Sequence, residues 1–200
     1  GDRRRALQLI GALRADPAAS PAAIRAEVIR PAQIEIGRLW EIGAITIAQE
    51  HMATAIAHVA LATLFEHDAP RPPNGKRVVV ACVDGELHEF PARLAADELD
   101  AAGFAVRFLG ASVPVQDLVD LVDRDPPDLV ALSATIARHA DAVRATVQAL
   151  RAPPRRSCPI AIGGQVCSWI SALGDELGVE IVGGDAAALV SRAEVLLGVA

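Results

Sequence analysis

The sequence lacks an excess of positive charge. Its 200 residues contain 19 Lys and Arg against 25 Asp and Glu, which gives a formal net charge of -6. A surface that neutralises phosphates is basic, and neither a zinc-finger spacing nor an arginine-rich arm offsets this charge. We therefore expect no nucleic acid to bind through this segment.

Cysteines and long apolar runs are also scarce. Cys82, Cys158 and Cys167 lie in or beside apolar stretches without C-x-x-C spacing, as is typical of packing thiols in a reducing cytoplasm. No apolar run approaches the ~20 residues that span a bilayer, and no signal-peptide core follows the charged start GDRRR. We expect a soluble, cytoplasmic protein without a membrane partner. Because the sequence begins with Gly1 and not with Met, our expectation includes an output domain upstream or on a separate protein.

The first part of the chain has a helical pattern. Apolar residues, 52% of the whole sequence, return every three or four positions between residues 2 and 67. A Pro-rich break at 16–21 ends a first helix, and a second helix begins near Pro21 and continues past Pro31 with a kink or short interruption. A third helix is expected at about 46–66. Three or four such helices would pack as a small bundle.

The pattern changes after the segment DAPRPPNGK (68–76), whose composition is that of a linker. Short β-branched runs then alternate with amphipathic helical stretches. The expected strands are RVVVACV (77–83), FAVRFLG (104–110), DLVALS (128–133), PIAIGG (159–164) and VEIVGG (179–184). This α/β pattern predicts a Rossmann-like domain with a five-stranded parallel sheet of flavodoxin-like order. We place a helical bundle at 1–70, a linker at 71–76 and the Rossmann-like domain at 77–200.

A ligand of such a sheet binds outside the carboxyl ends of the strands. The loops to watch are therefore 84–88, 110–114, 133–135, 163–165 and 183–185. In the first of them, Asp84-Gly85-Glu86-Leu87-His88, a histidine stands two residues after an acidic residue. The loop has no G-x-G-x-x-G and no P-loop lysine, which argues against a nucleotide. One interpretation is a helix start, with Asp84 or Glu86 as the cap and His88 simply exposed.

The other interpretation comes from a resemblance. Residues 78–122 resemble the cobalamin-binding domains, whose D-x-H-x-x-G motif presents the lower axial ligand of cobalt; here the motif reads Glu86-x-His88-x-x-Pro91. The resemblance implies that His88 binds the cobalt and that Glu86, replacing aspartate, fixes the tautomer of its imidazole. Pro91 replaces a glycine in the first turn of a helix, where proline is tolerated.

Two later motifs extend the resemblance. Ser133 and Thr135 occupy the S-x-L motif of these domains, and Gly163-Gly164 matches their double glycine. By the resemblance, small residues there admit the nucleotide tail of the cofactor, whereas an ordinary strand-to-helix turn is the alternative for each glycine pair. The residues expected to contact the cofactor in this domain are Asp84, Gly85, Glu86, Leu87, His88, Ser133, Thr135, Gly163, Gly164, Gly183 and Gly184.

The helical part carries one further signature. Trp40 is followed after nine residues by Glu50-His51. In isolation, a tryptophan in a bundle is usually core and a Glu-His pair usually a solvated face. This W-x9-EH spacing, however, resembles the helical cap of adenosylcobalamin-dependent photoreceptors of the CarH type. There the tryptophan lies over the adenosyl group, and the glutamate and histidine complete the pocket. The resemblance covers nearly the whole chain.

The resemblance implies a homo-oligomeric light sensor with adenosylcobalamin as cofactor and no enzymatic activity. A cobalt–carbon bond is weak and absorbs visible light, so a protein that responds when the adenosyl group leaves is a switch. One departure concerns the residue after the tryptophan, which is a cobalt-capturing histidine in CarH-type repressors and Glu41 here. His51 or His58 could substitute for that histidine.

Three alternatives remain open at this point. A corrinoid protein that carries methyl groups for a methyltransferase system has the same order of domains, but usually keeps the aspartate and glycine of the motif. A regulatory module could bind cobalamin as a structural ligand alone. A photocobilin-like sensor would add biliverdin as a second chromophore, for which the available side chains are His58, His67, His139, Arg138 and Arg155.

Overall fold

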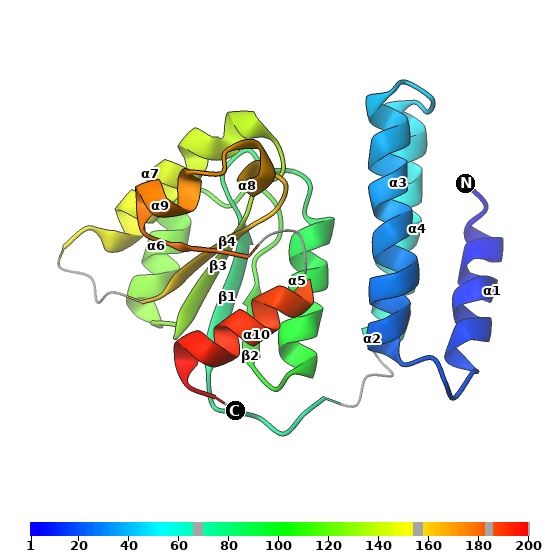
Figure 1. Cartoon of the computed structure of the whole chain (residues 1–200), viewed down its shortest axis with the longest axis horizontal. Helices are drawn as coiled ribbons and strands as arrows, with labels where there is room; N and C mark the ends of the chain where they lie inside the picture. Colours follow the sequence, from blue (N-terminus) through cyan, green and yellow to red (C-terminus); the bar gives the residue numbers. More distant parts are fainter. Residues whose placement is uncertain (66–69, 154–157, 183–185, 200) are drawn as a thin grey trace. The chain divides into compact units, whose positions relative to one another are not determined.

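The chain forms two compact units, a helical unit (Gly1–Ala69) and a Rossmann unit (Pro70–Ala200). The computed structural model describes residues 1–65, 70–153, 158–182 and 186–199 (Figure 1). Each unit has its own buried residues. Within the described residues, no helix combines the length and the apolar character needed to cross a membrane.

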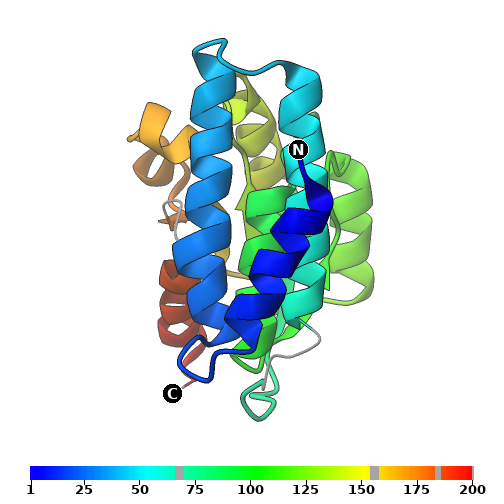
Figure 2. The same ribbon diagram turned by 90° about the vertical axis from the view of Figure 1, so that its right-hand side faces the viewer.

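The helical unit contains α1 (Arg3–Arg14), α2 (Pro21–Ile24), α3 (Arg30–Glu41) and α4 (Ile47–Phe65). Figure 2 shows α3 and α4 running side by side, connected by a short turn, and α1 packs against α4. The buried apolar residues of this unit are Ile10, Ile24, Ile29, Ala57, Ala60, Leu61 and Leu64. They form a small core, so the stability of this unit depends on few side chains.

The second predicted helix is continuous but irregular. It begins at Ser20, whose hydroxyl accepts a hydrogen bond from the Ala23 amide, and the π-helix η1 (Arg25–Ile29) joins α2 to α3. In η1 the Arg30 amide donates to the Arg25 carbonyl, five residues back. Pro31 follows directly, and a proline ring clashes with the preceding turn of a regular α-helix. The wider π-turn is the interruption that the sequence predicts near Pro31.

The Rossmann unit has a five-stranded parallel sheet in the order β2-β1-β3-β4-β5. Its strands are β1 (Arg77–Cys82), β2 (Ala105–Phe108), β3 (Leu129–Ser133), β4 (Ile160–Gly163) and β5 (Glu180–Ile181). Its helices are α5 (Phe90–Ala101), α6 (Val115–Arg124), the 3-10 helix η2 (Ala137–His139), α7 (Ala140–Arg151), α8 (Val166–Trp169), α9 (Leu173–Leu177) and α10 (Ala186–Leu197). The predicted fold class, a helical part followed by a parallel Rossmann-like sheet, is confirmed.

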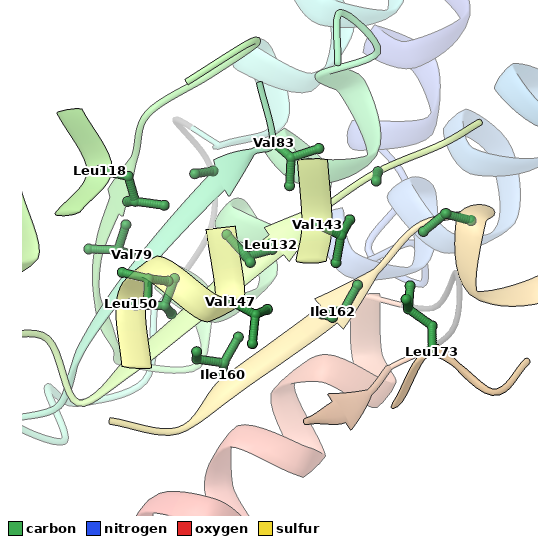
Figure 3. Packing of buried hydrophobic residues seen from close by; sticks show 14 of the residues in the cluster. Val79, Val83, Leu118, Leu132, Val143, Val147, Leu150, Ile160, Ile162 and Leu173 are labelled. Atoms are coloured by element: carbon green, nitrogen blue, oxygen red, sulfur yellow. The ribbon is translucent and has the colours of Figure 1, made fainter. Parts of the chain in front are cut away.

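Both faces of the sheet are covered, which is why its strands are apolar throughout. Successive side chains of a strand point to opposite faces. Val79 of β1 and Leu132 of β3 therefore join α6 and α7 in one core cluster (Figure 3). Val80 and Cys82 pack into the second cluster, which includes residues of α5 and α10. The three cysteines are free thiols, as predicted.

The strand register shows which residues lie together at the carboxyl ends of the strands, the edge where a ligand is expected. Cys82 at the end of β1 lies beside Ser133 at the end of β3, and Ser133 lies beside Gly163 at the end of β4. The loops that follow these three strands therefore leave the sheet at one level. Side chains far apart in the sequence meet there, and the candidate site lies at this edge.

Candidate functional site

A buried carboxylate organises the loop after β1. The side chain of Glu86 is 0% exposed, although it lies only three residues beyond Val83 in a turn at the sheet edge. Its Oε1 accepts hydrogen bonds from the backbone amide of His88 at 2.8 Å and from His88 Nδ1 at 2.6 Å. Its Oε2 accepts from the Thr135 amide and from His139 Nδ1 at 2.9 Å. Four donors thus compensate for the burial of one charge.

These contacts determine the charge of Glu86 and the tautomer of His88. Burial raises the pKa of Glu86, but the hydrogen bonds from His88, Thr135 and His139 outweigh it and lower the pKa from 4.5 to about 2. A carboxylate can only accept, so His88 Nδ1 carries the shared proton. A neutral imidazole in this tautomer has its lone pair on Nε2, the nitrogen that would bind a metal. The His88 side chain is 48% exposed.

The loop after β3 supplies the second half of the arrangement. Thr135 donates its amide to Glu86 from the segment between β3 and η2. His139, at the end of η2, is 7% exposed and contacts the same carboxylate oxygen. Arg138 Nε lies 3.4 Å from His139 Nε2 and donates to it. Adjacent strands in the sheet therefore bring two histidines onto one glutamate.

Two hydrogen bonds connect Ser112, in the loop after β2, to the loop after β1. The Ser112 hydroxyl accepts a hydrogen bond from the Gly85 amide at 3.0 Å, and the Ser112 amide donates to the Glu86 carbonyl at 2.8 Å. Ser112 has a φ of +48°, a strained value for a residue with a side chain. The loop 110–114 was expected at the ligand edge, but Ser112 within it was not among the expected site residues. A serine two residues after Gly110, in the loop that follows β2, was the available signal.

The double glycine after β4 has a local structural reason. Gly164 has a φ of +96°, and a Cβ atom there would lie 2.2 Å from the Ala134 carbonyl oxygen. The backbones after β3 and β4 approach so closely that only glycine fits. Next to this contact Ser133 is buried, and Thr135 Oγ1 is buried without a hydrogen-bond partner among the described residues. A bound molecule could satisfy that hydroxyl.

In the helical unit, the predicted residues lie at one end of the α3–α4 pair. Thr54 Oγ1 of α4 lies 3.0 Å from Gln33 Oε1 of α3 and 2.8 Å from Glu50 Oε1. Glu50 Oε2 in turn accepts from His51 Nδ1 at 2.6 Å. Trp40 is seven residues after Gln33, two helical turns along the same face, and its side chain is 46% exposed. Trp40 is therefore not a buried core residue of the helical unit.

The structure brings several of the predicted residues together at this edge of the sheet. Asp84 and Leu87 are exposed on the same loop as His88. Gly163 ends β4 beside Ser133. Among the possible bilin partners, His139 and Arg138 are engaged in the contacts around Glu86. Four residues named from the sequence lie outside the described part of the chain: His67, Arg155, Gly183 and Gly184.

Two further features do not coincide with this edge. A hollow of about 320 Å³ lies at the start of β1 and β2, the opposite edge of the sheet, and includes Arg77, Arg107 and Asp125 in its wall. Both arginines form ion pairs with Asp125, which explains their place in the fold. Among the described residues, no group of three or more His, Cys, Asp or Glu side chains is arranged to hold a metal ion.

Two family models match the chain. Residues 76–191 match a model described as a B12 binding domain. Residues 1–64 match a second model that is also described as a B12 binding domain. The two matches correspond to the Rossmann unit and to the helical unit.

Individual proteins match over most of the chain. The HTH-type transcriptional repressor CarH of Myxococcus xanthus is 33% identical over 159 residues, 80% of this chain and 52% of that protein. The chain thus spans about half the length of CarH. Dimethylamine corrinoid protein 3 of Methanosarcina acetivorans is 26% identical over 166 residues, 82% of this chain and 76% of that protein. The crystal structure of a cobalamin-binding protein from Desulfitobacterium hafniense is 26% identical with a TM-score of 0.55, covering 98% of this chain and 92% of that one.

Proposed function

Because the chain belongs to the B12-binding domain family, we propose that it is a light sensor whose two units share one adenosylcobalamin. Its cofactor is a cobalamin. The observation that carries the light-sensor proposal is the half-exposed Trp40 with the Glu50–His51 pair at the same end of the α3–α4 pair. Bound adenosylcobalamin would supply a cobalt–carbon bond that visible light breaks.

The Rossmann unit fits a corrinoid in three respects. His88 offers one imidazole nitrogen, which suits a metal that a macrocycle already coordinates, and Glu86 holds the ring in the required tautomer. The positive φ of Gly85 and Gly164 keeps the backbone at this edge free of side chains. The buried Thr135 Oγ1 offers a polar contact to the part of the cofactor that enters beside the sheet. These residues would hold the lower side of the cofactor.

The helical unit also has residues that suit a cobalamin with an adenosyl group. A tryptophan of which nearly half is exposed presents a large rigid surface that a ligand can cover. Glu50 is held by Thr54 and His51, so its carboxylate is oriented before any ligand arrives. It can accept hydrogen bonds from an adenosyl group. Loss of that group would expose Trp40 again, at a cost of about 3 kcal/mol, roughly a hundredfold in an assembly equilibrium.

Size-exclusion chromatography of the adenosylcobalamin complex, in darkness and after green light, tests this proposal. We expect a changed elution volume after illumination. The change should disappear in Trp40→Ala and persist in Trp169→Ala, a matched control because Trp169 is the second tryptophan and is also exposed. Identical behaviour of the two variants would contradict a specific role for Trp40.

A corrinoid methyl carrier is the second candidate, and the match to a dimethylamine corrinoid protein over 76% of that protein favours it. It predicts a complex that bleaches in light while its size and its proteolysis pattern stay the same. A bilin as second chromophore predicts a far-red absorbance band that appears only after biliverdin is added.

A further inference from the structure

A second histidine, His139, is hydrogen-bonded to Glu86, and it is not part of the motif around His88. His139 lies 53 residues after Glu86 and reaches it from η2, at the end of the neighbouring strand β3. Its Nδ1 is 2.9 Å from Oε2, while His88 Nδ1 is 2.6 Å from Oε1. One buried carboxylate therefore lies between two histidines, of which His139 is buried and His88 is half-exposed.

The direction of the hydrogen bonds follows from the donors at each end. Backbone amides, which can only donate, contact both oxygens of Glu86, so both oxygens act as acceptors. At the other end, the guanidinium of Arg138 has donors alone, and its Nε contacts His139 Nε2 at 3.4 Å. Nε2 of His139 must then accept, and Nδ1 must carry the proton that is donated to Glu86. Arg138 thus selects the tautomer of His139.

Packing alone does not account for a histidine at position 139. A buried imidazole is costly unless its nitrogens have partners, and an apolar side chain could fill the same space. The loop after β1 lies against His139, because a Cβ atom at Gly85 would be in van der Waals contact with His139 Nε2, at 3.8 Å. Without His139, Oε2 of Glu86 would keep the hydrogen bond from the Thr135 amide but lose the one from the imidazole, and the carboxylate would be less constrained.

We propose that His139 is a positioning residue which, through Glu86, fixes the ring orientation and the tautomer of His88. Its significance for the cofactor rests on the proposed function, in which His88 is the ligand of cobalt. The order of donors, from Arg138 to His139 to Glu86, links η2 to the loop after β1. His139 itself contacts neither a metal nor a substrate in this role.

Two substitutions separate positioning from packing. His139→Leu keeps the volume and removes the donor, whereas His139→Asn places an amide nitrogen near the position of Nδ1 and keeps the donor. Thr146→Val is the matched control, because Thr146 is a buried polar residue of the following helix α7 whose hydroxyl bonds to the Ala142 carbonyl and not to Glu86.

The first measurement is ¹⁵N NMR of the imidazole rings in the cofactor-free protein. We expect His88 Nδ1 to show the protonated type of shift in the native protein, in His139→Asn and in Thr146→Val. In His139→Leu we expect a mixture of tautomers at His88.

The second measurement is titration with hydroxocobalamin, followed by its visible spectrum. His139→Leu should bind about tenfold more weakly, as is usual when an outer partner of a metal-ligating histidine is lost, and His139→Asn should recover most of the affinity.

The proposal is overturned if His139→Leu leaves the His88 tautomer and the hydroxocobalamin affinity unchanged, or if Thr146→Val loses as much. Should His139→Leu fail to fold, His139→Gln replaces it, because its amide overlies Nε2 instead of Nδ1. His88→Ala separates this proposal from the proposed function. An unchanged spectrum in His88→Ala contradicts His88 as the ligand of cobalt, while the NMR measurement decides the role of His139 in either case.

Discussion

At the scale of single residues, the site depends on the length of the Glu86 side chain. Glutamate replaces the aspartate of the usual motif, and its extra methylene lets one carboxylate contact both its own loop and the loop after β3. A shorter side chain would place its oxygens closer to the backbone of residue 86. The substitution is thus a structural change that connects two loops, and it has a measurable consequence for stability.

Glu86→Gln should destabilise the cofactor-free protein in a pH-dependent way. The pKa of Glu86 is about 2 in the folded protein, below its ordinary value of 4.5. Its contribution is therefore fully present above about pH 4.5 and is lost as the pH falls toward 2. We expect a stability difference between native protein and Glu86→Gln on the order of 3 kcal/mol at pH 7, which shrinks between pH 5 and pH 2.

Urea unfolding at several pH values measures this difference. Tryptophan fluorescence is a suitable signal, because the two tryptophans lie in different units, Trp40 in the helical unit and Trp169 in the Rossmann unit. A Trp40→Phe background leaves Trp169 as the reporter of the unit that contains Glu86. A difference of equal size at pH 7 and pH 3 would show that the Glu86 carboxylate is not held as described.

At the scale of elements, the close approach of two loops is the tightest feature of the sheet edge. The backbone after β4 passes Ala134 at a distance that a Cβ atom on Gly164 would violate. Gly37, in the middle of α3, is the opposite case, since a Cβ atom there would meet nothing within 4 Å. Replacing these two glycines by alanine should therefore change the free energy of unfolding in opposite directions.

Gly164→Ala should destabilise the Rossmann unit by roughly 3 kcal/mol or more, because it combines a positive φ with a backbone clash. Gly37→Ala should stabilise the helical unit by about 0.5–1 kcal/mol, because alanine favours the helix and costs no space. Thermal unfolding with single-tryptophan reporters measures each unit separately. A mild effect of Gly164→Ala would mean that the loops after β3 and β4 can separate without cost.

The elements themselves could be predicted from the sequence far better than the contacts between their ends. Alternating β-branched runs and helical stretches predicted five parallel strands and their order, because right-handed crossovers leave few alternatives. The interruption near Pro31 was also predictable, since proline cannot continue a regular helix. Its form as a π-turn was not, because the hydrogen-bond register depends on how the helix packs.

The contacts of the site between residues far apart in the sequence could not be predicted. The pairing of Glu86 with His88 was expected from the resemblance to cobalamin-binding domains. His139 was named only as a side chain available to a bilin, and nothing in the local sequence connects it to Glu86. Their contact depends on the adjacency of β1 and β3 and on the turn of η2. Ser112 was missed for another reason: its contact with the loop after β1 requires a backbone conformation with positive φ that serine seldom adopts.

At the scale of the whole molecule, the chain consists of two units with separate cores that the proposed function joins through one ligand. A ligand that contacts both units stabilises both, since it binds the folded forms and not the unfolded ones. If light removes part of that ligand, the helical unit loses more than the Rossmann unit, because Trp40 and Glu50 lie in the helical unit. Light would then change the coupling between the two units.

Differential scanning calorimetry of the full chain tests this coupling most directly, with cofactor-free protein, the adenosylcobalamin complex in darkness and the same complex after green light. We expect two transitions without cofactor, since each unit has its own core. In the dark complex we expect the transition of the helical unit to shift upward and merge with that of the Rossmann unit. After illumination it should return toward its cofactor-free temperature. A helical-unit transition at the same temperature in all three samples would contradict a cofactor shared by the two units.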